Sequence, residues 1–258
     1  MIGFWTLTLK NLILPIFCKR CGIRLLTEEN GFFCPVCWER SPRVERPFCT
    51  LCGRPHEGAV GFGTLHNFPC ADCREVSARA RPYGRIYGAA VYAGAVEDAI
   101  KLFKFGGRQR LARPLAAMMG EFVAREVETE QYDYLVPVPL HRVRERDRGF
   151  NQARLLMHEL LPFFPNAKPD ESLRRLRPTR VQSRLTNASE RRANVVGAFG
   201  VQDGVHLRGK TALLIDDVVT TSGTVSECAK VLRKAGVSRV DVLAAALAVP
   251  DAGDARTE

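Results

Sequence analysis

The stretch from residue 213 to residue 224 reads LLIDDVVTTSGT, and it predicts a strand, a pair of acids and a polar loop that opens a helix. The apolar run 211–215 has the length and composition of a buried strand, and the helical pattern of residues 224–235 stops at Gly236. Asp216 and Asp217 therefore stand at the end of a buried strand. The loop after them consists of Val218, Val219, Thr220, Thr221, Ser222, Gly223 and Thr224.

This loop has the chemistry of a phosphate cradle. Its backbone N–H groups, its hydroxyls and the positive N-terminus of the helix can surround one phosphate, and two carboxylates just before it can accept hydrogen bonds from a vicinal diol. A ribose 5-phosphate offers both groups. Helix capping alone asks for one Asp or Ser and gives no reason for a second acid. The chain lacks G-x-x-x-x-G-K-[ST] and a G-x-G-x-x-G after a strand, so P-loop and dinucleotide sites are excluded.

Outward from this stretch, strands and helices alternate. The hydrophobic pattern predicts the following segments, which comprise strands at 86–92, 134–138, 211–215 and 240–249 and helices at 96–105, 111–127, 150–161 and 224–235. Such alternation predicts an α/β fold with a mostly parallel sheet and helices on both faces. Ligands of these sheets bind beyond the carboxyl ends of the strands.

Eight of the nine cysteines form four C-x-x-C pairs. They are Cys18 with Cys21, Cys34 with Cys37, Cys49 with Cys52 and Cys70 with Cys73. Two such pairs supply the four thiolates of a tetrahedral zinc site, and the spacing between pairs is typical of zinc ribbons. We therefore expect two structural Zn²⁺ ions, with sequential pairing favoured over interleaved pairing.

Other uses of these cysteines fit less well. Disulfides require an oxidising compartment, and the N-terminus lacks the features of a signal peptide, so we expect a cytoplasmic protein. A redox C-x-x-C is normally a single pair. His56 or His66 could replace one cysteine ligand, although a solvated loop histidine is the simpler interpretation. Cys228 lies in an apolar helical pattern and is expected to be a buried small hydrophobic residue.

The chain is basic, with 38 Lys+Arg against 28 Asp+Glu and a formal net charge of +10. Residues 139–192 hold 12 Arg and 1 Lys against 6 acids. The planar arginine fork matches phosphate, so this segment is the expected place for phosphate or polyanion binding, although Arg-rich codon usage would give the same excess.

Composition changes suggest four parts of the chain. Residues 1–17 are expected to form an amphipathic segment that packs on the zinc module, on a partner or on a membrane surface, and they are too short and polar for a transmembrane helix. Residues 18–80 would be the double zinc ribbon, 83–250 the α/β domain and 251–258 a disordered tail.

The stretch LLIDDVVTTSGT resembles the phosphoribosyl pyrophosphate (PRPP) binding motif of type I phosphoribosyltransferases. The chain as a whole resembles one branch of them, the ComF family of ComFC/GntX-like competence proteins, over about residues 12–249. Further motifs stand in order along the chain, namely the four C-x-x-C pairs, PVPLH at 137–141, RxRGFNQ at 146–152, TxxQxxL at 179–185, RxxNV at 191–195 and AF at 198–199.

The resemblance implies a role for each matching residue. Asp216 and Asp217 would hold the ribose hydroxyls, and residues 220–224 would bind the 5-phosphate. The remaining candidates are assigned to the pyrophosphate loop and the flap over it, and they are Leu140, His141, Arg142, Arg146, Arg148, Thr179, Gln182 and Arg191. In this enzyme class Mg²⁺ bridges the ribose diol and pyrophosphate, and the reaction displaces pyrophosphate at C1.

Two departures from the motif bear on activity. Ser222 stands where the motif usually has Gly, which would strain the loop if a positive φ is required there. Thr220 replaces the acid that purine transferases use for the base. The resemblance thus implies three functions: a transferase with an unknown acceptor, a DNA-uptake factor that binds single-stranded DNA and helicase-like competence proteins, and a silent PRPP sensor or scaffold. The first two are compatible.

Overall fold

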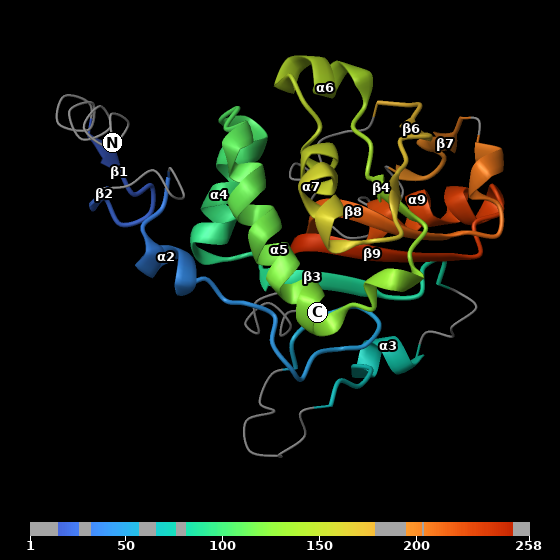
Figure 1. Ribbon diagram of the computed structural model, residues 1–258, viewed down its shortest axis with the longest axis horizontal. Helices are drawn as coiled ribbons and strands as arrows, with labels where there is room; N and C mark the ends of the chain where they lie inside the picture. Colours follow the sequence, from blue (N-terminus) through green and yellow to red (C-terminus); the bar gives the residue numbers. More distant parts are fainter. Residues whose placement is uncertain are drawn as a thin grey trace, which may run out of the picture.

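A five-stranded parallel sheet in the order β3-β9-β8-β4-β5 forms the centre of the protein (Figure 1). This computed structural model describes residues 15–25, 32–56, 66–75, 81–178, 195–202 and 204–249. The strands of the sheet are β3 (Ile86–Val91), β9 (Arg239–Leu247), β8 (Thr211–Val219), β4 (Tyr134–Pro137) and β5 (Lys168–Pro169). The predicted α/β class with a parallel sheet is confirmed.

Helices cover both faces of this sheet. Helices α4, α5 and α7 lie on one face and α9 lies on the other (Figure 1). The helices are α4 (Gly94–Phe105), α5 (Ala112–Glu126), α6 (Arg142–Arg148), α7 (Gln152–Leu160) and α9 (Gly223–Lys234). Because both faces are covered, β8 is apolar on consecutive residues from Ala212 to Ile215, and all of them are fully buried.

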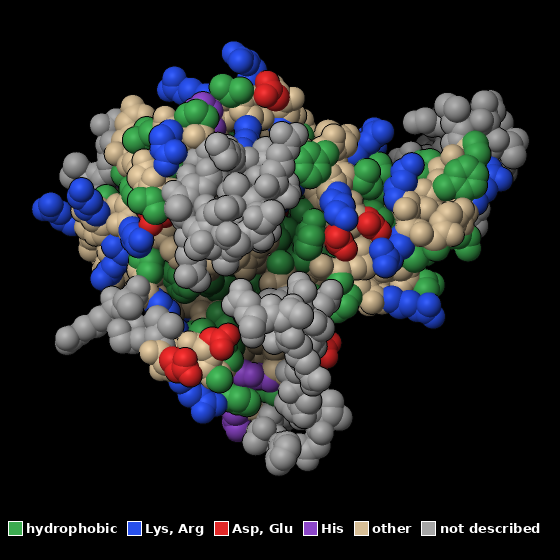
Figure 2. All heavy atoms as spheres, turned by 180° about the vertical axis from the view of Figure 1, so that it is seen from behind, with side chains coloured by type: hydrophobic (Ala, Val, Ile, Leu, Met, Phe, Trp, Pro, Cys, Tyr) green, Lys and Arg blue, Asp and Glu red, His purple; other side chains and the backbone are tan. Residues whose placement is uncertain are grey.

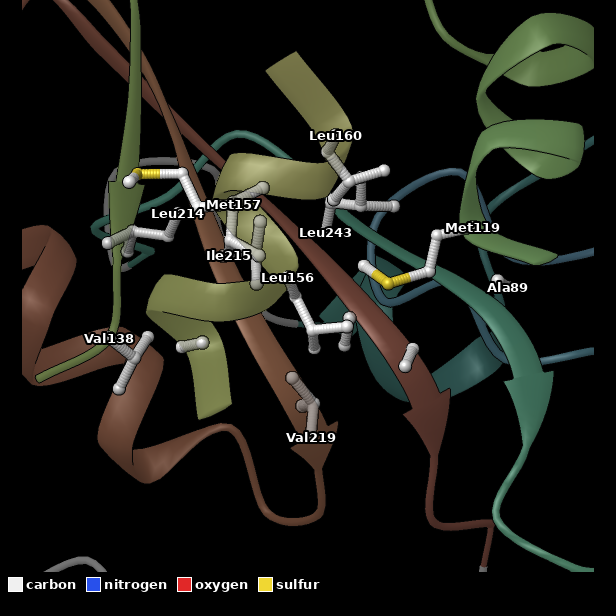
Figure 3. Close-up of a cluster of buried hydrophobic side chains, with 14 of the residues drawn as sticks. Ala89, Met119, Val138, Leu156, Met157, Leu160, Leu214, Ile215, Val219 and Leu243 are labelled. Carbon is white, nitrogen blue, oxygen red and sulfur yellow. The ribbon is translucent and has the colours of Figure 1, made fainter. Parts of the chain in front are cut away.

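The core lies between the sheet and α5 and α7. Helix α7 buries Leu156, Met157 and Leu160 on one side, which is the spacing of an amphipathic helix. Figure 3 shows these side chains and Met119 of α5 gathered over Leu243 and the neighbouring strands. Burial of each such side chain contributes on the order of 1.5–3 kcal/mol, so the packing of this layer holds the carboxyl ends of the strands in place.

The smaller elements flank the sheet. They are β1 (Ile16–Phe17), β2 (Arg24–Leu25), α2 (Pro35–Glu39), α3 (Ala71–Glu75), β6 (Leu173–Arg175), β7 (Phe199–Val201) and the 3-10 helices Gln109–Leu111, Thr129–Gln131, Leu161–Phe163 and Gly204–Leu207. Strands β1 and β2 form one antiparallel hairpin, and β6 and β7 pair as another antiparallel ribbon. Within the described ranges, no helix has the length and apolar character needed to span a membrane.

Most expected elements begin or end within two residues of the observed ones, and two expectations differ by more. Strand β8 does not end at residue 215 but continues through Asp216 and Asp217 to Val219, because β9 pairs with it as far as Val219 and Leu247. Arg142, expected in a turn, begins helix α6. The expected segment 1–17 is described only from Pro15 onward, where Ile16 and Phe17 form β1. The expected tail 251–258 lies outside the described residues.

The connections of the sheet create a switch point between β4 and β8. From β4 the chain passes through α6 and α7 to the edge strand β5, whereas from β8 it passes through α9 to β9 on the other side. The connections of these two neighbouring strands therefore leave in opposite directions. Open parallel sheets bind their ligands in the crevice beyond the carboxyl ends at such a point.

Candidate functional site

A cleft of about 850 Å³ opens at the switch point, beyond the carboxyl ends of β8 and β4. One wall is the loop from Val218 to Val225, and the opposite wall comes from residues 138–140 together with parts of α6 and α7. The end of α4 and Arg175 of β6 complete it. The sequence stretch that decides the fold therefore also forms the floor and one wall of the cleft.

Asp217 is held by a lysine from another part of the chain. The Lys104 Nζ lies 2.7 Å from the Asp217 Oδ1, and the two side chains are 24% and 8% exposed. Burial on its own would lower the pKa of Lys104, but the charge of Asp217 and its hydrogen bond outweigh burial and raise that pKa. Lys104 is consequently a firmly protonated cation inside the cleft.

Asp216 has no such partner at ion-pair distance among the described residues, and its Oδ1 accepts a hydrogen bond of 2.9 Å from the backbone N–H of Asp217. Adjacent strand residues point to opposite faces, so Asp216 and Asp217 approach the cleft from opposite sides of β8. Burial, followed by the charge of Asp217, raises the pKa of Asp216 to about 7. The expected repulsion between the two acids thus adds to the larger effect of burial on the pKa of Asp216.

The polar loop contains a strained residue. Ser222 has φ 55° and ψ 1°, and within the described ranges it is the one non-glycine residue with a positive φ. Position 222 therefore does require the left-handed conformation, and a serine adopts it at a cost that glycine would not incur. Its Oγ accepts a long hydrogen bond of 3.5 Å from the Tyr83 hydroxyl, and it does not cap the first N–H groups of α9.

The wall formed by residues 138–140 is anchored by Asn151 at the start of α7. Its Nδ2 donates to the carbonyl of Val138 at 3.1 Å, and its Oδ1 accepts from the N–H of Ala153 at 3.0 Å. The motif residue Asn151 thus ties the helix to the end of β4. Gly149, with φ 83°, ends α6 and turns the chain toward this contact.

Arginines enter the cleft from α6 and β6. Arg148 donates to the Gln152 Oε1 at 2.6 Å, and its guanidinium lies 5.5 Å from the ring centre of Phe105. Burial lowers the pKa of Arg148 and of Arg175, although both remain cations at neutral pH because arginine titrates far above it. Together with Lys104 and Arg144, they make this side of the cleft electropositive.

The cleft brings together part of the predicted set. Asp216, Asp217, residues 218–224, Leu140 and Arg148 line it, whereas His141, Arg142 and Arg146 do not. Instead, the His141 Nδ1 accepts from the N–H of Val143 at 3.3 Å and caps α6. The remaining flap residues Thr179, Gln182 and Arg191 lie outside the described residues.

Sequence reasoning missed Lys104, Arg175 and Gln152 as cleft residues. Lys104 looked like an ordinary cation in the last turn of a helix, where positive charge is common. Gln152 belongs to the RxRGFNQ motif, so its place in the motif was a usable signal. Arg175 lies in the Arg-rich segment, where charge alone does not single out one residue.

The eight paired cysteines form two clusters. One comprises Cys18, Cys21, Cys34 and Cys37, and the other comprises Cys49, Cys52, Cys70 and Cys73. Within each cluster the sulfur atoms lie within 4.8 Å of one another, so the pairing is sequential, as expected. A tetrahedral site with Zn–S bonds of about 2.3 Å has edges of about 3.8 Å. The sulfur atoms of Cys21 and Cys34 are 3.7 Å apart and those of Cys52 and Cys70 are 3.8 Å apart, so the donor set fits zinc.

Local backbone geometry directs N–H groups at these sulfur atoms. The Cys49 Sγ accepts from the N–H groups of Leu51, Cys52 and Cys70, and Gly53 supplies the positive φ of 74° that closes this turn. Neither histidine replaces a cysteine: His56 stacks on Phe68 at 3.9 Å between ring centres, and His66 belongs to neither cluster. Cys228 is fully buried in α9, as expected.

The second cysteine cluster is built onto the edge of the sheet. The segment from residue 42 to residue 51, which leads into this cluster, runs beside β3. The N–H of Val91 donates to the carbonyl of Pro42, the N–H of Val44 to the carbonyl of Ala89, and the N–H of Ile86 to the carbonyl of Leu51. These contacts cover an otherwise open sheet edge. The first cluster contacts α4 through Arg20, whose Nη1 lies 2.9 Å from the Asp98 Oδ2.

Comparisons with known proteins agree with this architecture. A family model described as a double zinc ribbon domain matches residues 9–74. The chain is 31% identical to the DNA utilization protein YhgH of Escherichia coli (strain K12), over 90% of this chain and 96% of that protein. It is 28% identical to Competence protein F of Haemophilus influenzae, over 87% and 94% of the two chains. It is 26% identical to Competence protein ComFC of Bacillus subtilis, over 82% of each.

Among solved structures, phosphoribosylpyrophosphate synthetase from Mycobacterium smegmatis is similar over 52% of this chain and 33% of that chain, with 18% identity and a TM-score of 0.26. The fold and the cysteine clusters define an α/β protein with a double zinc ribbon that provides two four-cysteine zinc sites. The identity to YhgH over nearly the whole of both chains shows that the chain belongs to the ComF family.

Proposed function

We propose that the cleft binds PRPP together with Mg²⁺. The observation that carries this proposal is the meeting of the Asp216–Asp217 pair, the loop 220–224 and several cations in one cleft at the switch point of the sheet. The two acids and the loop suit a ribose 5-phosphate, and the cations suit a pyrophosphate group. PRPP carries a 5-phosphate, a ribose diol and a pyrophosphate, so it would contact the loop, the two acids and the cations of the cleft.

Each part of PRPP has a proposed place. The 5-phosphate would accept hydrogen bonds from the N–H groups at the start of α9 and from the hydroxyls of residues 220–224. The ribose hydroxyls would donate to Asp216 and Asp217. The pyrophosphate would lie against the cationic side formed by Arg144, Arg148 and Arg175. Mg²⁺ bound with PRPP would supply charge neutralisation between the diol and the pyrophosphate.

These residues also suit phosphoribosyl transfer. In that reaction the bond between C1 and the pyrophosphate oxygen breaks, a bond from C1 to the acceptor forms, and pyrophosphate leaves with both electrons of the broken bond. The developing positive charge on the ribose would be stabilised by the two carboxylates, and the departing charge by the arginines. We infer a pentosyl transferase as the leading function, with an acceptor that the cleft does not identify.

Isothermal titration calorimetry with PRPP tests the binding proposal. The wild-type chain should bind PRPP with Mg²⁺ present and much more weakly without it. Asp216→Asn combined with Asp217→Asn should abolish this binding in a chain that remains folded. The matched control is Glu121→Gln combined with Glu128→Gln, which removes two exposed carboxylates outside the cleft. Unchanged PRPP affinity in the aspartate double variant would refute the proposal.

A catalytically silent PRPP sensor or scaffold is the alternative, and the strained Ser222 in the phosphate loop favours it. Pyrophosphate release, measured with PRPP and Mg²⁺ over a panel of acceptors, separates the two. Release that depends on an acceptor and is lost in the aspartate double variant identifies the transferase. PRPP binding without release for any acceptor identifies the sensor.

A second proposed function is single-stranded DNA binding in DNA uptake, performed in the cytoplasm with helicase-like competence proteins as partners. It is supported by the names of the relatives, which are a DNA utilization protein and competence proteins. Lys and Arg side chains stand out over much of the face shown in Figure 2. On α6, Arg142 and Arg146 are exposed and do not line the cleft, so they are available to a polyanion outside it.

Fluorescence anisotropy with a labelled single-stranded oligonucleotide tests this function. Affinity should be weak, independent of sequence and steeply reduced by salt, because charge contacts release counterions. Arg142→Glu combined with Arg146→Glu should weaken binding strongly. Arg113→Glu combined with Arg125→Glu changes the net charge equally on the exposed side of α5 and is the matched control. Equal loss in both variants would show that only net charge matters and would refute an α6 site.

A further inference from the structure

Lys104 stands out among the residues of the cleft because it is the single lysine among the described residues that line it, and it comes from α4, the helix that follows β3. It lies in the last turn of helix α4, which is fixed to the core by the fully buried Ile100 and Phe103. Its Nζ lies 2.7 Å from the Asp217 Oδ1. The ammonium is therefore part of the folded cleft.

The chemistry of an acidic pair explains why this position matters. Two adjacent carboxylates in a partly buried cleft repel each other unless a cation lies beside them. A divalent metal is one such cation, and a lysine ammonium is another. Here the Lys104 ammonium already contacts one oxygen of Asp217. Asp217 consequently has its second oxygen left for a ligand hydroxyl.

The neighbouring Lys101 provides a comparison on the same helix. Its Nζ lies 2.7 Å from the Glu97 Oε1, the same distance as in the Lys104 pair, but its side chain is 54% exposed and lies outside the cleft. Exposed pairs of this kind contribute little to stability. The two lysines thus form ion pairs of equal length, and only Lys104 faces the acidic pair of the cleft.

We propose that Lys104 is a positioning residue that serves as the built-in cation of the cleft, keeping a divalent metal from binding Asp217 directly in the free protein and holding Asp217 for a hydroxyl of the ligand. The inference rests on the proposed function, because it assumes a ligand, PRPP, that carries a ribose diol and arrives with its own Mg²⁺. It follows that Mg²⁺ enters the cleft with the ligand and not before it.

Binding of Mn²⁺ alone, followed by electron paramagnetic resonance, tests this directly. The wild-type chain should bind Mn²⁺ no better than its Asp217→Asn variant. Lys104→Met should create a Mn²⁺ site, with an affinity at least about tenfold higher than that of the wild type, because removal of a unit charge a few ångströms from two acids strengthens their attraction for a cation. Adding Asp217→Asn to Lys104→Met should abolish the new site.

Three further variants make the outcome specific. Lys101→Met removes the neighbouring lysine and should leave Mn²⁺ binding unchanged. Lys104→Arg retains a cation and should bind no Mn²⁺, and Lys104→Gln should gain the site as Lys104→Met does while retaining a hydrogen bond to Asp217. A wild-type chain that binds Mn²⁺ tightly through Asp217 would overturn the proposal even if every Lys104 variant failed to fold.

The PRPP titration tests the proposed function, and the Mn²⁺ experiment tests the role of Lys104 independently of it. If PRPP binds, Lys104→Met should weaken PRPP binding at saturating Mg²⁺, whereas Lys101→Met should not. If no variant binds PRPP but Lys104→Met gains a Mn²⁺ site, the proposed function fails and the role of Lys104 stands. Equal Mn²⁺ binding by wild type and by both neutral Lys104 variants overturns the role of Lys104 whatever PRPP does.

Discussion

The two ends of the central sheet treat buried acids in opposite ways. At the amino end of β9, Asp241 is fully buried and accepts from the N–H of Arg85 at 3.0 Å and from the Tyr132 hydroxyl at 2.9 Å, while the Arg239 Nη2 lies 2.8 Å away. At the carboxyl end of β8, two acids are adjacent, and only Asp217 has a lysine, Lys104, at ion-pair distance among the described residues.

The difference distinguishes an acid that stabilises the fold, Asp241, from a pair of acids that forms a candidate binding site, Asp216 and Asp217. One acid with several donors is a satisfied polar network that fixes the packing of β3 against β9. Two acids with one lysine and a strained serine beside them retain unfavourable interactions that folding alone would not select. We therefore expect substitution of Asp241 at the amino end to destabilise the fold and neutralisation of Asp216 at the carboxyl end to stabilise it while impairing binding.

The largest effect is expected at the amino end. Asp241→Asn removes the charge that pairs with Arg239 and replaces one acceptor oxygen by an amide donor, which then faces either the Arg85 N–H or the Tyr132 hydroxyl and Arg239. The free energy of unfolding should fall by about 2–3 kcal/mol, since breaking a buried pair leaves its partners unsatisfied. Urea denaturation measures this. Tyr132→Phe, which removes one donor, should cost about 1 kcal/mol. An Asp241→Asn variant with an unchanged free energy of unfolding would contradict the contrast between the two ends.

The second prediction concerns pH at the carboxyl end. The pKa of Asp216 is raised to about 7 in the folded chain, so without ligand the wild type should lose stability as pH rises from about 4 to about 7. Asp216→Asn should remove this loss. At pH 8 the variant should be more stable by about 2 kcal/mol, which is below the full value of about 1.4 kcal/mol per pKa unit because cleft water screens the charge.

Thermal unfolding across this pH range, with and without the substitution, measures the effect. The two melting temperatures should converge below about pH 4, where Asp216 is protonated in both folded and unfolded chains. A difference that is constant with pH would mean that Asp216 is not the titrating group. If the variant is less stable than the wild type at pH 8, Asp216 stabilises the fold as Asp241 does, and the prediction is wrong.

The smallest effect is expected at Ser222. Ser222→Gly relieves the left-handed backbone strain but loses the weak hydrogen bond from Tyr83, and glycine has more freedom in the unfolded chain. The net result should be a stabilisation of roughly 0.5 kcal/mol. Tyr83→Phe, which removes only the hydrogen bond, is the control and should change stability still less. Clear destabilisation by Ser222→Gly would show that the serine side chain supports the loop.

Local patterns predicted much of the structure. The C-x-x-C spacing predicted both zinc clusters and their sequential pairing, because two residues between cysteines place both sulfur atoms on one turn. The alternating segments predicted the parallel sheet. The predicted end of β8 was wrong because two adjacent acids are unusual inside a strand. Asp216 and Asp217 belong to β8 because this part of the chain pairs with β9. The helix α6 was missed because its polar sequence lacks an apolar face.

The sequence by itself determined the residues that act locally, which are the zinc ligands, the acidic pair and the loop after it. Only the tertiary structure decided which cations meet those acids, namely Lys104 from α4, Arg148 from α6 and Arg175 from β6. It also decided that the segment before the second zinc cluster covers the edge of β3. The physical reason is that spacing along the chain fixes geometry only within a turn or a strand, whereas contacts between distant segments depend on how the crossovers pack on the sheet.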